Sequence, residues 1–348
     1  MTQNISEELY NSAFLKACRR EKTDYTPIWL MRQAGRYQES YRKLREKVPF
    51  LELCKTPELA TKVTVEAVEQ TGVDAAIIFS DLLPILEPMG AKLEYVAGNK
   101  PTIHNPIRNA QDIENFRELD DVQTLSYVFE ALTQTRAALP NDVPLIGFGG
   151  APFTLASYLI EGGGSKNYVH TKKLMYSDKG AWNEILSKIA RAVTKYLNAQ
   201  LESGAQVVQI FDSWVGVLSP EDYREYVLPH TQSIVNSVTK GFPIIHFGTG
   251  TATLLEMMKD CGDVIGVDWH INLDEAWRKI GHDKAVMGNL DSTALFAPRQ
   301  IVLDKAKRVL DLAENREGHI FNLGHGILPE TPMDNVVALV DFVHNYGR

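Results

Sequence analysis

The 348-residue sequence contains only three cysteines, Cys18, Cys54 and Cys261, and it has no Cys-X-X-Cys pair. A disulfide framework needs a larger and even set, so we expect free thiols and a reducing compartment. No apolar run approaches the roughly 18 residues of a membrane-spanning helix. The first residues, MTQNISEELY, lack the basic and apolar regions of a secretory signal. We therefore expect a cytoplasmic protein without membrane segments.

Positive charge is in deficit, with 36 Lys and Arg residues against 44 Asp and Glu residues and a net charge of −8. This balance argues against a non-specific nucleic-acid binder, because such proteins carry an uncompensated basic surface. One segment departs from the trend: WLMRQAGRYQESYRKLR, residues 29–45, contains five basic residues and one glutamate. It is either a solvated helix face or a local anion site.

Short apolar segments rich in β-forming residues recur along the chain, each followed by a longer stretch of helical period. They cover residues 27–31, 74–80, 144–150, 207–213, 243–248, 264–269, 285–291 and 319–326. Runs without polar alternation suit parallel strands that are buried on both faces. Eight such units predict an α/β fold, a single (β/α)8 TIM-barrel domain over residues 1–348, with its active-site cleft at the carboxyl ends of the strands. A doubly wound sheet is the alternative, but no Gly-X-Gly-X-X-Gly follows the first segment.

Two connections are too long for simple loops. We expect residues 81–143 and 151–206 to hold extra helices or a small excursion such as KLEYV, residues 92–96. The glycine-rich stretch 161–170 is a candidate for a mobile lid. Helix starts are predicted at Ser6, at Ser219-Pro220 and at Thr331-Pro332.

A barrel brings the carboxyl ends of its strands together, so polar residues at these ends should surround one cavity. The residues read off in this way are Arg32, Arg36, Asp81, Gly149, Gly150, Tyr158, Asp212, Ser213, His246, Asp268, His270, Asn289, Asp291 and His325. No lysine ends a predicted strand, which disfavours Schiff-base chemistry. His246, Asp268 and His270 leave a metal site open as an alternative.

Arg32 and Arg36 lie four residues apart, which on a helical turn would place both guanidinium groups on one side. Gly35 between them permits the close approach of a ligand. Two guanidinium groups aimed together suit a carboxylate or phosphate, so we favour binding over a solvated face. Arg42 and Lys43 are interpreted as solvated surface.

Asp81 directly follows the second predicted strand. An aspartate there is either a helix N-cap or an ionised carboxylate that needs N–H donors, since its neighbours Phe79, Leu82 and Leu83 are apolar. The N–H groups of a ligand would supply such donors.

Three further strand ends leave alternatives open. The glycines of GFGG, with the cluster 162–164, suit either a phosphate-binding nest or tight turns. Ser213 lacks the Gly-X-Ser-X-Gly surroundings of a nucleophile and is interpreted as a hydrogen-bond donor or cap. Tyr158 either packs or points into the cavity. His325, between two glycines, is either structural or available for binding and proton transfer.

The motifs MRQAGRY, FSDLLPIL, FGGAPFTLASY, FDSWVG and GHGILP occur in this order over nearly the whole chain, which resembles the uroporphyrinogen decarboxylase family of haem biosynthesis. The resemblance implies a (β/α)8 domain, commonly a homodimer. It also implies a reaction without cofactor or metal, in which the four acetate side chains of uroporphyrinogen III become methyl groups. The products would be coproporphyrinogen III and carbon dioxide. A substrate with eight carboxylates would account for a basic segment in an acidic protein.

The resemblance also implies particular site residues. Substrate contacts fall on Arg32, Gln33, Ala34, Gly35, Arg36, Arg45, Asp81, Tyr158, Ser213 and His325, and apolar walls on Phe50 or Leu51, Phe79, Phe148 and Phe211. Among the contacts, we expect the catalytic positions to be Asp81, Arg32, Tyr158 and His325.

Loss of carbon dioxide leaves an electron pair, and with no cofactor motif the pyrrole itself must accept it. We expect Asp81 to accept hydrogen bonds from pyrrole N–H groups and to stabilise a cationic, ring-protonated intermediate. Arg32 is expected to clamp a carboxylate, because a guanidinium with a pKa above about 12 is a poor proton donor. His325, Tyr158 or water is then left as the donor.

Two other functions fit parts of the pattern. A related barrel methyltransferase of the corrinoid or thiol type would need zinc held by His and Cys, but no cysteine ends a predicted strand. A non-catalytic tetrapyrrole carrier would use the same pocket without releasing carbon dioxide.

Overall fold

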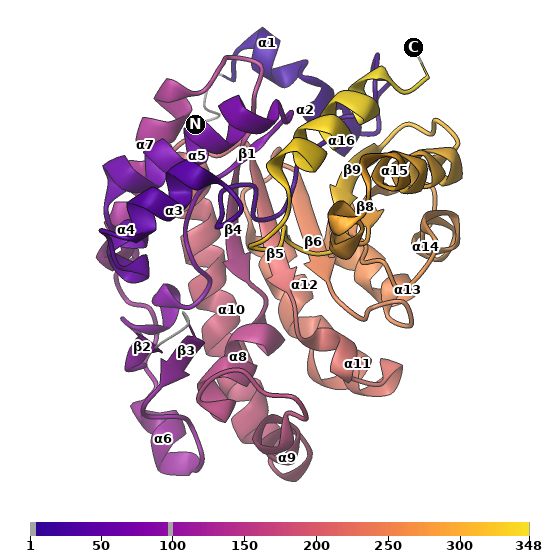
Figure 1. Ribbon diagram of the computed structural model, residues 1–348. Coiled ribbons are helices and arrows are strands. Elements are labelled where there is room, and N and C mark those ends of the chain that lie inside the picture. Colours follow the sequence, from indigo (N-terminus) through magenta and orange to yellow (C-terminus); the bar gives the residue numbers. More distant parts are fainter. Residues whose placement is uncertain (1–4, 97–99, 348) are drawn as a thin grey trace.

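A curled sheet of parallel strands forms the centre of the molecule, with helices packed around its outer face (Figure 1). The computed structural model describes residues 5–96 and 100–347, and within them this sheet has seven strands. In order across the sheet they are β1 (Ala76–Ile77), β4 (Leu145–Gly150), β5 (Val207–Asp212), β6 (Ile244–Gly248), β7 (Val264–Gly266), β8 (Ala285–Leu290) and β9 (His319–Leu323). The order of the strands in space follows the order in sequence, as in a barrel.

The eighth position of the ring is occupied by the segment around Ile28, which lies between β9 and the chain just before β1. Phe321 N–H donates to Pro27 O at 2.8 Å, and Trp29 N–H donates to Phe321 O at 3.3 Å. On the other side, Asp74 N–H donates to Ile28 O at 2.8 Å. The predicted strand 27–31 is therefore in place, but it forms only an isolated parallel bridge from Ile28 to Phe321.

Side chains explain why this segment is not a regular strand. The carboxylate of Asp74 accepts from Ile28 N–H at 2.7 Å, and the amide oxygen of Asn322 accepts from Met31 N–H at 3.2 Å. These side chains take amide donors that a strand would give to its neighbour, so the ladder is interrupted. The prediction of eight regular strands was wrong in this respect.

Helices follow the strands and cover the sheet. The longer ones are α5 (Pro57–Thr71), α7 (Ser126–Ala138), α8 (Pro152–Glu161), α9 (Val169–Ser177), α10 (Lys179–Glu202), α12 (Leu228–Ser237), α14 (Leu273–Ile280), α15 (Arg299–Ala313) and α16 (Met333–Asn345). The shorter ones are α1 (Glu7–Tyr10), α2 (Ala13–Cys18), α3 (Glu39–Arg45), α4 (Phe50–Lys55), α6 (Ala110–Asn115), α11 (Pro220–Tyr226) and α13 (Leu255–Met258). Short 3-10 turns are η1 (Pro84–Leu86), η2 (Val122–Leu125), η3 (Val215–Val217), η4 (Lys259–Cys261) and η5 (Ser292–Phe296).

Two of the three predicted helix starts are confirmed by their caps. Ser6 accepts from Leu9 N–H at the start of α1, and Ser219 accepts from Asp222 N–H at the start of α11. The third was wrong in detail, because α16 begins at Met333 and no side chain caps it. The hydroxyl of Thr331 is buried without a hydrogen-bond partner among the described residues.

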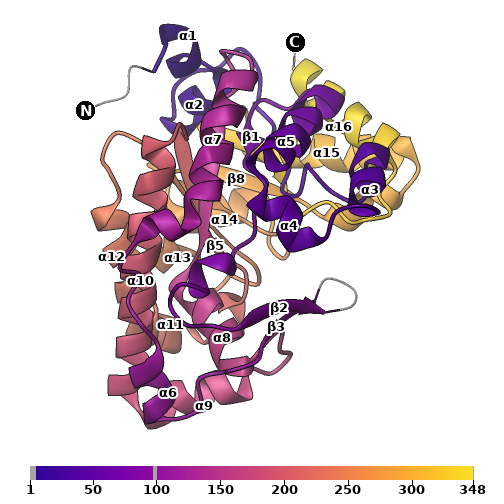
Figure 2. The ribbon, with the colours of Figure 1, turned by 90° about the vertical axis from the view of Figure 1, so that its left-hand side faces the viewer.

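The long connections hold the expected additions. Residues 92–96 enter an antiparallel hairpin, β2 (Leu93–Val96) with β3 (Lys100–Ile103), which projects from the barrel (Figure 2). The second connection contains α8, α9 and α10. Both views place the hairpin away from α1 and α16, which lie at the upper end of the molecule.

The main hydrophobic core runs through the chain, from Leu9 before the barrel to Val343 in α16, and a small second cluster contains Tyr41, Leu53 and Val63. Its largest fully buried side chains include Trp29, Trp182 and Trp277. Among the described helices, none combines the length and the hydropathy needed to cross a bilayer.

Candidate active site

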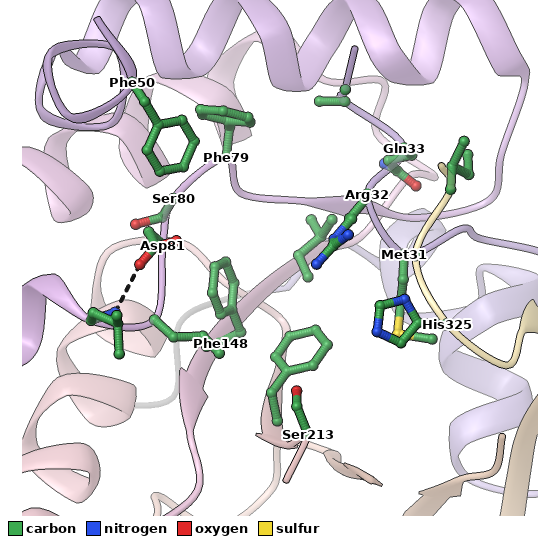
Figure 3. A pocket seen from close by; sticks show the side chains of 18 of the residues that line it. Met31, Arg32, Gln33, Phe50, Phe79, Ser80, Asp81, Phe148, Ser213 and His325 are labelled. Carbon is green, nitrogen blue, oxygen red and sulfur yellow. Dashed lines mark hydrogen bonds between the residues drawn. The ribbon is translucent and has the colours of Figure 1, made fainter. Parts of the chain in front are cut away.

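A cavity of about 460 Å³ opens at the carboxyl ends of the strands (Figure 3). Its lining comes from the 31–36 turn, from helices α3, α4 and α8, from β1 and the segment after it, from the hairpin, from β4, and from the ends of β5, β6 and β9. Of the residues predicted for substrate contact, it includes Arg32, Gln33, Ala34, Gly35, Arg36, Asp81, Tyr158, Ser213 and His325. Asp81 lies on one side and His325 on the other, and the Arg32 side chain points into the space between them.

Asp81 is half-buried at the start of a turn that leads into η1. Its Oδ1 accepts from Leu83 N–H at 2.9 Å and from the hydroxyl of Tyr95. This is a local Asx turn rather than a helix N-cap, since the residue that caps η1 is Leu83. Desolvation raises the pKa of the Asp81 carboxyl, whereas the Tyr95 bond, the backbone amide of Leu83 and the charge of Arg32 oppose the rise.

Arg32 stands in the left-handed backbone region, with φ of 61°, in a turn rather than the expected helix. Such conformations are costly for a residue with a Cβ and occur where the fold demands them. The side chain crosses Gly326, where an added Cβ would lie 2.4 Å from Cδ of Arg32. Desolvation by the surrounding protein lowers the pKa of the guanidinium, Tyr158 and Asp81 oppose this, and the charge of Arg36 adds to it.

Arg36 also lines the cavity, so the two arginines meet there without the helical turn that the spacing suggested. Within the described residues, neither guanidinium donates a hydrogen bond to a protein acceptor. Two such groups facing one cavity form an anion site that is free for a ligand.

Tyr158 and Ser213 are held on the same wall by a buried link between α8 and β5. The hydroxyl of Thr154, one turn before Tyr158, donates to Asp212 Oδ1 at 3.0 Å and accepts from Trp214 N–H at 3.3 Å. The Tyr158 ring packs edge-on against Trp214, with centroids 5.8 Å apart. Burial raises the pKa of the Tyr158 phenol, and the charge of Asp81 adds to this. Tyr158 therefore faces the cavity as a neutral hydroxyl.

His325 follows β9 and is half-buried beside Trp269, with ring centroids 6.4 Å apart. Burial lowers the pKa of the imidazole, and the nearby Arg32 charge lowers it further. The His325 ring is thus neutral at pH 7, able to donate or accept a proton through its two nitrogens.

Aromatic side chains make up the remaining walls. Phe50, Phe79, Phe148 and Phe211 all line the cavity, whereas Leu51, the alternative to Phe50, does not. Phe148 and Phe211 pack edge-on with centroids 5.5 Å apart. The cavity therefore joins a charged centre to flat apolar surfaces.

Several residues that the sequence placed around this cavity lie elsewhere. The lining does not include Gly149, Gly150, Asp212, His246, Asp268, His270, Asn289, Asp291 or Arg45. Successive strand residues point to opposite faces, so Phe211 and Phe247 face the cavity while Asp212 and His246 face the helices. Gly150 serves close packing, because an added Cβ would lie 2.7 Å from the side chain of Leu155.

The metal-site alternative fails on geometry. His246 is fully buried beside Asp212, with Nε2 and Oδ2 3.7 Å apart, whereas Asp268 pairs with His270 at 2.7 Å. In residues 5–96 and 100–347, no three His, Cys, Asp or Glu side chains come together as a metal site would require.

Arg45 also departs from its expected place. Its guanidinium donates to Val48 O and lies 5.7 Å from the ring centroid of Phe50, which does line the cavity. Arg45 is therefore next to a cavity wall but is not part of the lining.

The sequence reasoning missed Tyr95, although it identified the excursion that carries this residue. Tyr95 lines the cavity from β2 and bonds directly to Asp81. Its position depends on the hairpin folding back over a residue 14 positions earlier, and no local pattern reports that return.

Comparison with known proteins shows which family the chain belongs to. Residues 9–346 match the family described as "Uroporphyrinogen decarboxylase (URO-D)". The chain belongs to the uroporphyrinogen decarboxylase family. Curated relatives with that name include proteins of Carboxydothermus hydrogenoformans and Sorangium cellulosum, each 53% identical over 96% of both chains. The Roseiflexus uroporphyrinogen decarboxylase is 49% identical over 97% of this chain and 99% of its own. The predicted family and its carboxy-lyase activity are confirmed.

Solved structures with the same fold include a methyltransferase from Methanosarcina mazei. The TM-score is 0.77, the identity is 24%, and the match covers 97% of this chain and 98% of that one. At this level of identity the likeness concerns the fold alone, and it agrees with the barrel assigned to this uroporphyrinogen decarboxylase family member.

Proposed function

We propose that the chain converts uroporphyrinogen III to coproporphyrinogen III in the cavity around Asp81, releasing one carbon dioxide from each of four acetate side chains and using no cofactor. One observation carries this proposal. A carboxylate and two arginines without protein acceptors face the same aromatic-walled cavity. A macrocycle with N–H groups at its centre and carboxylates at its edge complements that arrangement.

Binding follows from charge and shape. Arg32 and Arg36 would pair with substrate carboxylates, because guanidinium–carboxylate pairs combine charge with directed hydrogen bonds. Gln33, Ala34 and Gly35 line the cavity beside them, with the N–H of Gln33 bonded to Leu30 O and that of Gly35 bonded to Gln38 Oε1. The aromatic walls would cover the pyrrole faces, and a tetrapyrrole that carries eight negative charges would be attracted to the local basic site.

The reaction needs an electron sink. Protonating the ring carbon next to the carbon that bears the acetate makes a cationic ring. This ring accepts the electron pair left when the bond to the carboxylate breaks. The exocyclic methylene then gains a proton and becomes methyl, and the proton on the ring carbon leaves, so that the aromatic pyrrole is restored and one proton is consumed for each carbon dioxide released. Asp81 would accept hydrogen bonds from pyrrole N–H groups and stabilise the positive charge as it develops. Preorganised groups of this kind contribute about 10²–10³ in rate.

The proton donor is expected to be His325, Tyr158 or water, because both side chains line the cavity and carry transferable protons. Arg32 acts instead as a carboxylate clamp, since guanidinium groups hold their protons tightly. Tyr158→Phe and His325→Gln separate the two side chains, and water is the donor if neither variant loses most of kcat. The donor's variant should lose most of kcat, whereas loss of a binding contact should mainly raise KM.

Anaerobic incubation of the chelator-treated protein with uroporphyrinogen III tests the whole proposal. Products are resolved by the number of carboxylates that remain. Stepwise appearance of seven-, six-, five- and four-carboxylate species supports the cofactor-free reaction. Tight binding without release of carbon dioxide would instead make the protein a carrier, and activity that returns only with added zinc would point to a metal-dependent enzyme.

The number of domains, the oligomeric state and the cellular location are further parts of the proposal. We propose a single domain over residues 1–348, which the continuous core supports, and a homodimer, which rests on the family resemblance. Light scattering of the purified protein should give twice the chain mass of 39.0 kDa. A cytoplasmic location is consistent with three buried free cysteines, and cell fractionation tests it.

A further inference from the structure

The two oxygens of Asp81 have different surroundings. Oδ1 receives both hydrogen bonds of defined geometry, from Leu83 N–H at 2.9 Å and from the Tyr95 hydroxyl. In the described part of the chain, no hydrogen bond of that kind ends on Oδ2. The backbone amide of Leu82 also lowers the pKa of the carboxyl. Oδ1 thus has two protein partners, whereas Oδ2 is left to accept from a ligand in the cavity.

Tyr95 reaches Asp81 from the β2–β3 hairpin. It lies on β2, opposite Pro101 of β3, and its half-buried ring packs against Phe50 with centroids 5.1 Å apart. The phenol is a cavity-lining group rather than a surface one. A ring held in this way has few rotamers, so its hydroxyl is delivered to one place.

The hairpin that carries Tyr95 is anchored to the rest of the site. Ile103 N–H donates to Gly162 O at 2.9 Å, and Thr102 forms an antiparallel bridge with Gly163. Gly162 ends α8 in the left-handed conformation, with φ of 87°. The same helix carries Tyr158, so backbone hydrogen bonds join the two elements whose tyrosines face Asp81.

We propose that Tyr95 is a positioning residue for Asp81: its hydroxyl occupies Oδ1 and leaves Oδ2 to accept from the substrate N–H groups. This inference rests on the role proposed above for Asp81. It gives the β2–β3 hairpin a part in catalysis through Tyr95, a residue for which no role was predicted from the sequence.

The electrostatic balance at Asp81 agrees with this role. Desolvation raises the pKa of the carboxyl, and the Tyr95 hydroxyl is the strongest of the groups that lower it again. The titratable and charged groups that face Asp81 from the surrounding elements are Arg32, Cys54, Tyr95, Tyr127, Tyr158 and Tyr196. Of these, Tyr95 alone donates a direct side-chain hydrogen bond to Asp81 within the described residues.

These opposing contributions predict the direction in which the pKa of Asp81 changes when the Tyr95 hydroxyl is removed. Tyr95→Phe removes only the hydroxyl, so the pKa of Asp81 should rise, and a higher pH would be needed to ionise it. The acid limb of kcat/KM, which reports the free enzyme, should move up by about one pH unit. The variant should then be about tenfold slower than wild type on that limb and nearly equal to it on the plateau at higher pH.

The experiment compares pH profiles of kcat/KM for four proteins under anaerobic conditions: wild type, Tyr95→Phe, Tyr127→Phe and Asp81→Asn. Substrate carboxylates titrate identically in all of them, so ratios to wild type isolate the enzyme. Tyr127→Phe is the matched control, because this nearby phenol makes no hydrogen bond to a described residue and does not line the cavity. Its profile should superimpose on wild type.

The possible results distinguish the role of Tyr95 from that of Asp81. A shifted acid limb for Tyr95→Phe alone supports the inference. A Tyr95→Phe profile parallel to wild type, with Asp81→Asn inactive, overturns the role of Tyr95 and leaves that of Asp81 standing. Near-normal activity of Asp81→Asn overturns both. Adding Tyr95→Phe to Asp81→Asn should change nothing further, since the carboxylate on which it acts is gone.

Discussion

Replacing Asp81 by asparagine should lower the activity of the enzyme without lowering the stability of its fold. Asparagine has nearly the same shape, and its amide oxygen can still accept the bonds from Leu83 and Tyr95. What it lacks is the negative charge. If that charge stabilises the cationic ring, kcat/KM should fall at least 10²–10³-fold, which corresponds to about 2.7–4 kcal/mol.

Stability should not fall with activity. Because the pKa of Asp81 is raised in the folded protein, the folded chain binds a proton more tightly than the unfolded chain. The unfolding free energy therefore decreases as pH rises from the unfolded pKa, about 3.9, through the folded pKa. At neutral pH the ionised carboxylate is a net cost, so the thermal midpoint of Asp81→Asn should equal or exceed that of wild type.

The measurements are anaerobic turnover, product analysis by carboxylate number, and calorimetric unfolding. Asp291→Asn is the matched control. Asp291 caps η5 through Thr293 N–H and lies outside the cavity, and asparagine caps equally well. A folded Asp81→Asn enzyme that keeps a tenth or more of its activity would refute the catalytic argument. A thermal midpoint lowered by several degrees would refute the argument from desolvation, since each kcal/mol shifts the midpoint of a chain this size by about 1.5 °C.

Three further changes have clear expectations. Arg32→Lys keeps a charge but loses the planar fork, so kcat/KM should fall at least about tenfold; wild-type activity would contradict a bidentate clamp. Thr154→Val removes the hydroxyl donor from the buried Asp212 carboxylate, which should cost about 1–3 kcal/mol in denaturant titrations, while Thr154→Ser is spared. Burial lowers the pKa of His319 to about 4, so the unfolded chain takes up a proton first as pH drops below 6.5. Unfolding free energy should decrease by up to about 3 kcal/mol between pH 6.5 and 4, and a His319→Gln profile of equal slope would contradict this.

The strand positions were accessible from the sequence because parallel strands buried on both faces leave continuous apolar runs. The long connection after β1 was also recognisable as more than a loop. Which polar residues at the strand ends face the cavity was less accessible. Ser213 faces it and Asp212 faces the helices, yet the two are adjacent and both polar. A strand pattern predicts that successive side chains point to opposite faces of the sheet. Which of them faces the cavity depends on the twist of the sheet and on the helices that pack outside it.

Other features depend on contacts between distant residues. Arg32 and Arg36 converge because of a left-handed turn, not because of the four-residue spacing that suggested a helix. Tyr95 enters the site only when the hairpin folds back. The family motifs identified the site as a set, which is why most of their residues line one cavity although the local geometry assigned to them was partly incorrect.

The closure of the ring of strands determines when the active site can form during synthesis. Met31, next to Arg32, binds the side chain of Asn322 through its N–H and accepts from Ile327 N–H at 2.9 Å through its carbonyl. Asn322 follows Met31 by 291 residues, so Arg32 is made long before the groups that hold the backbone next to it. That backbone is fixed only when β9 and the segment after it have been made. Catalysis in this protein therefore depends on joining two segments that leave the ribosome far apart in time.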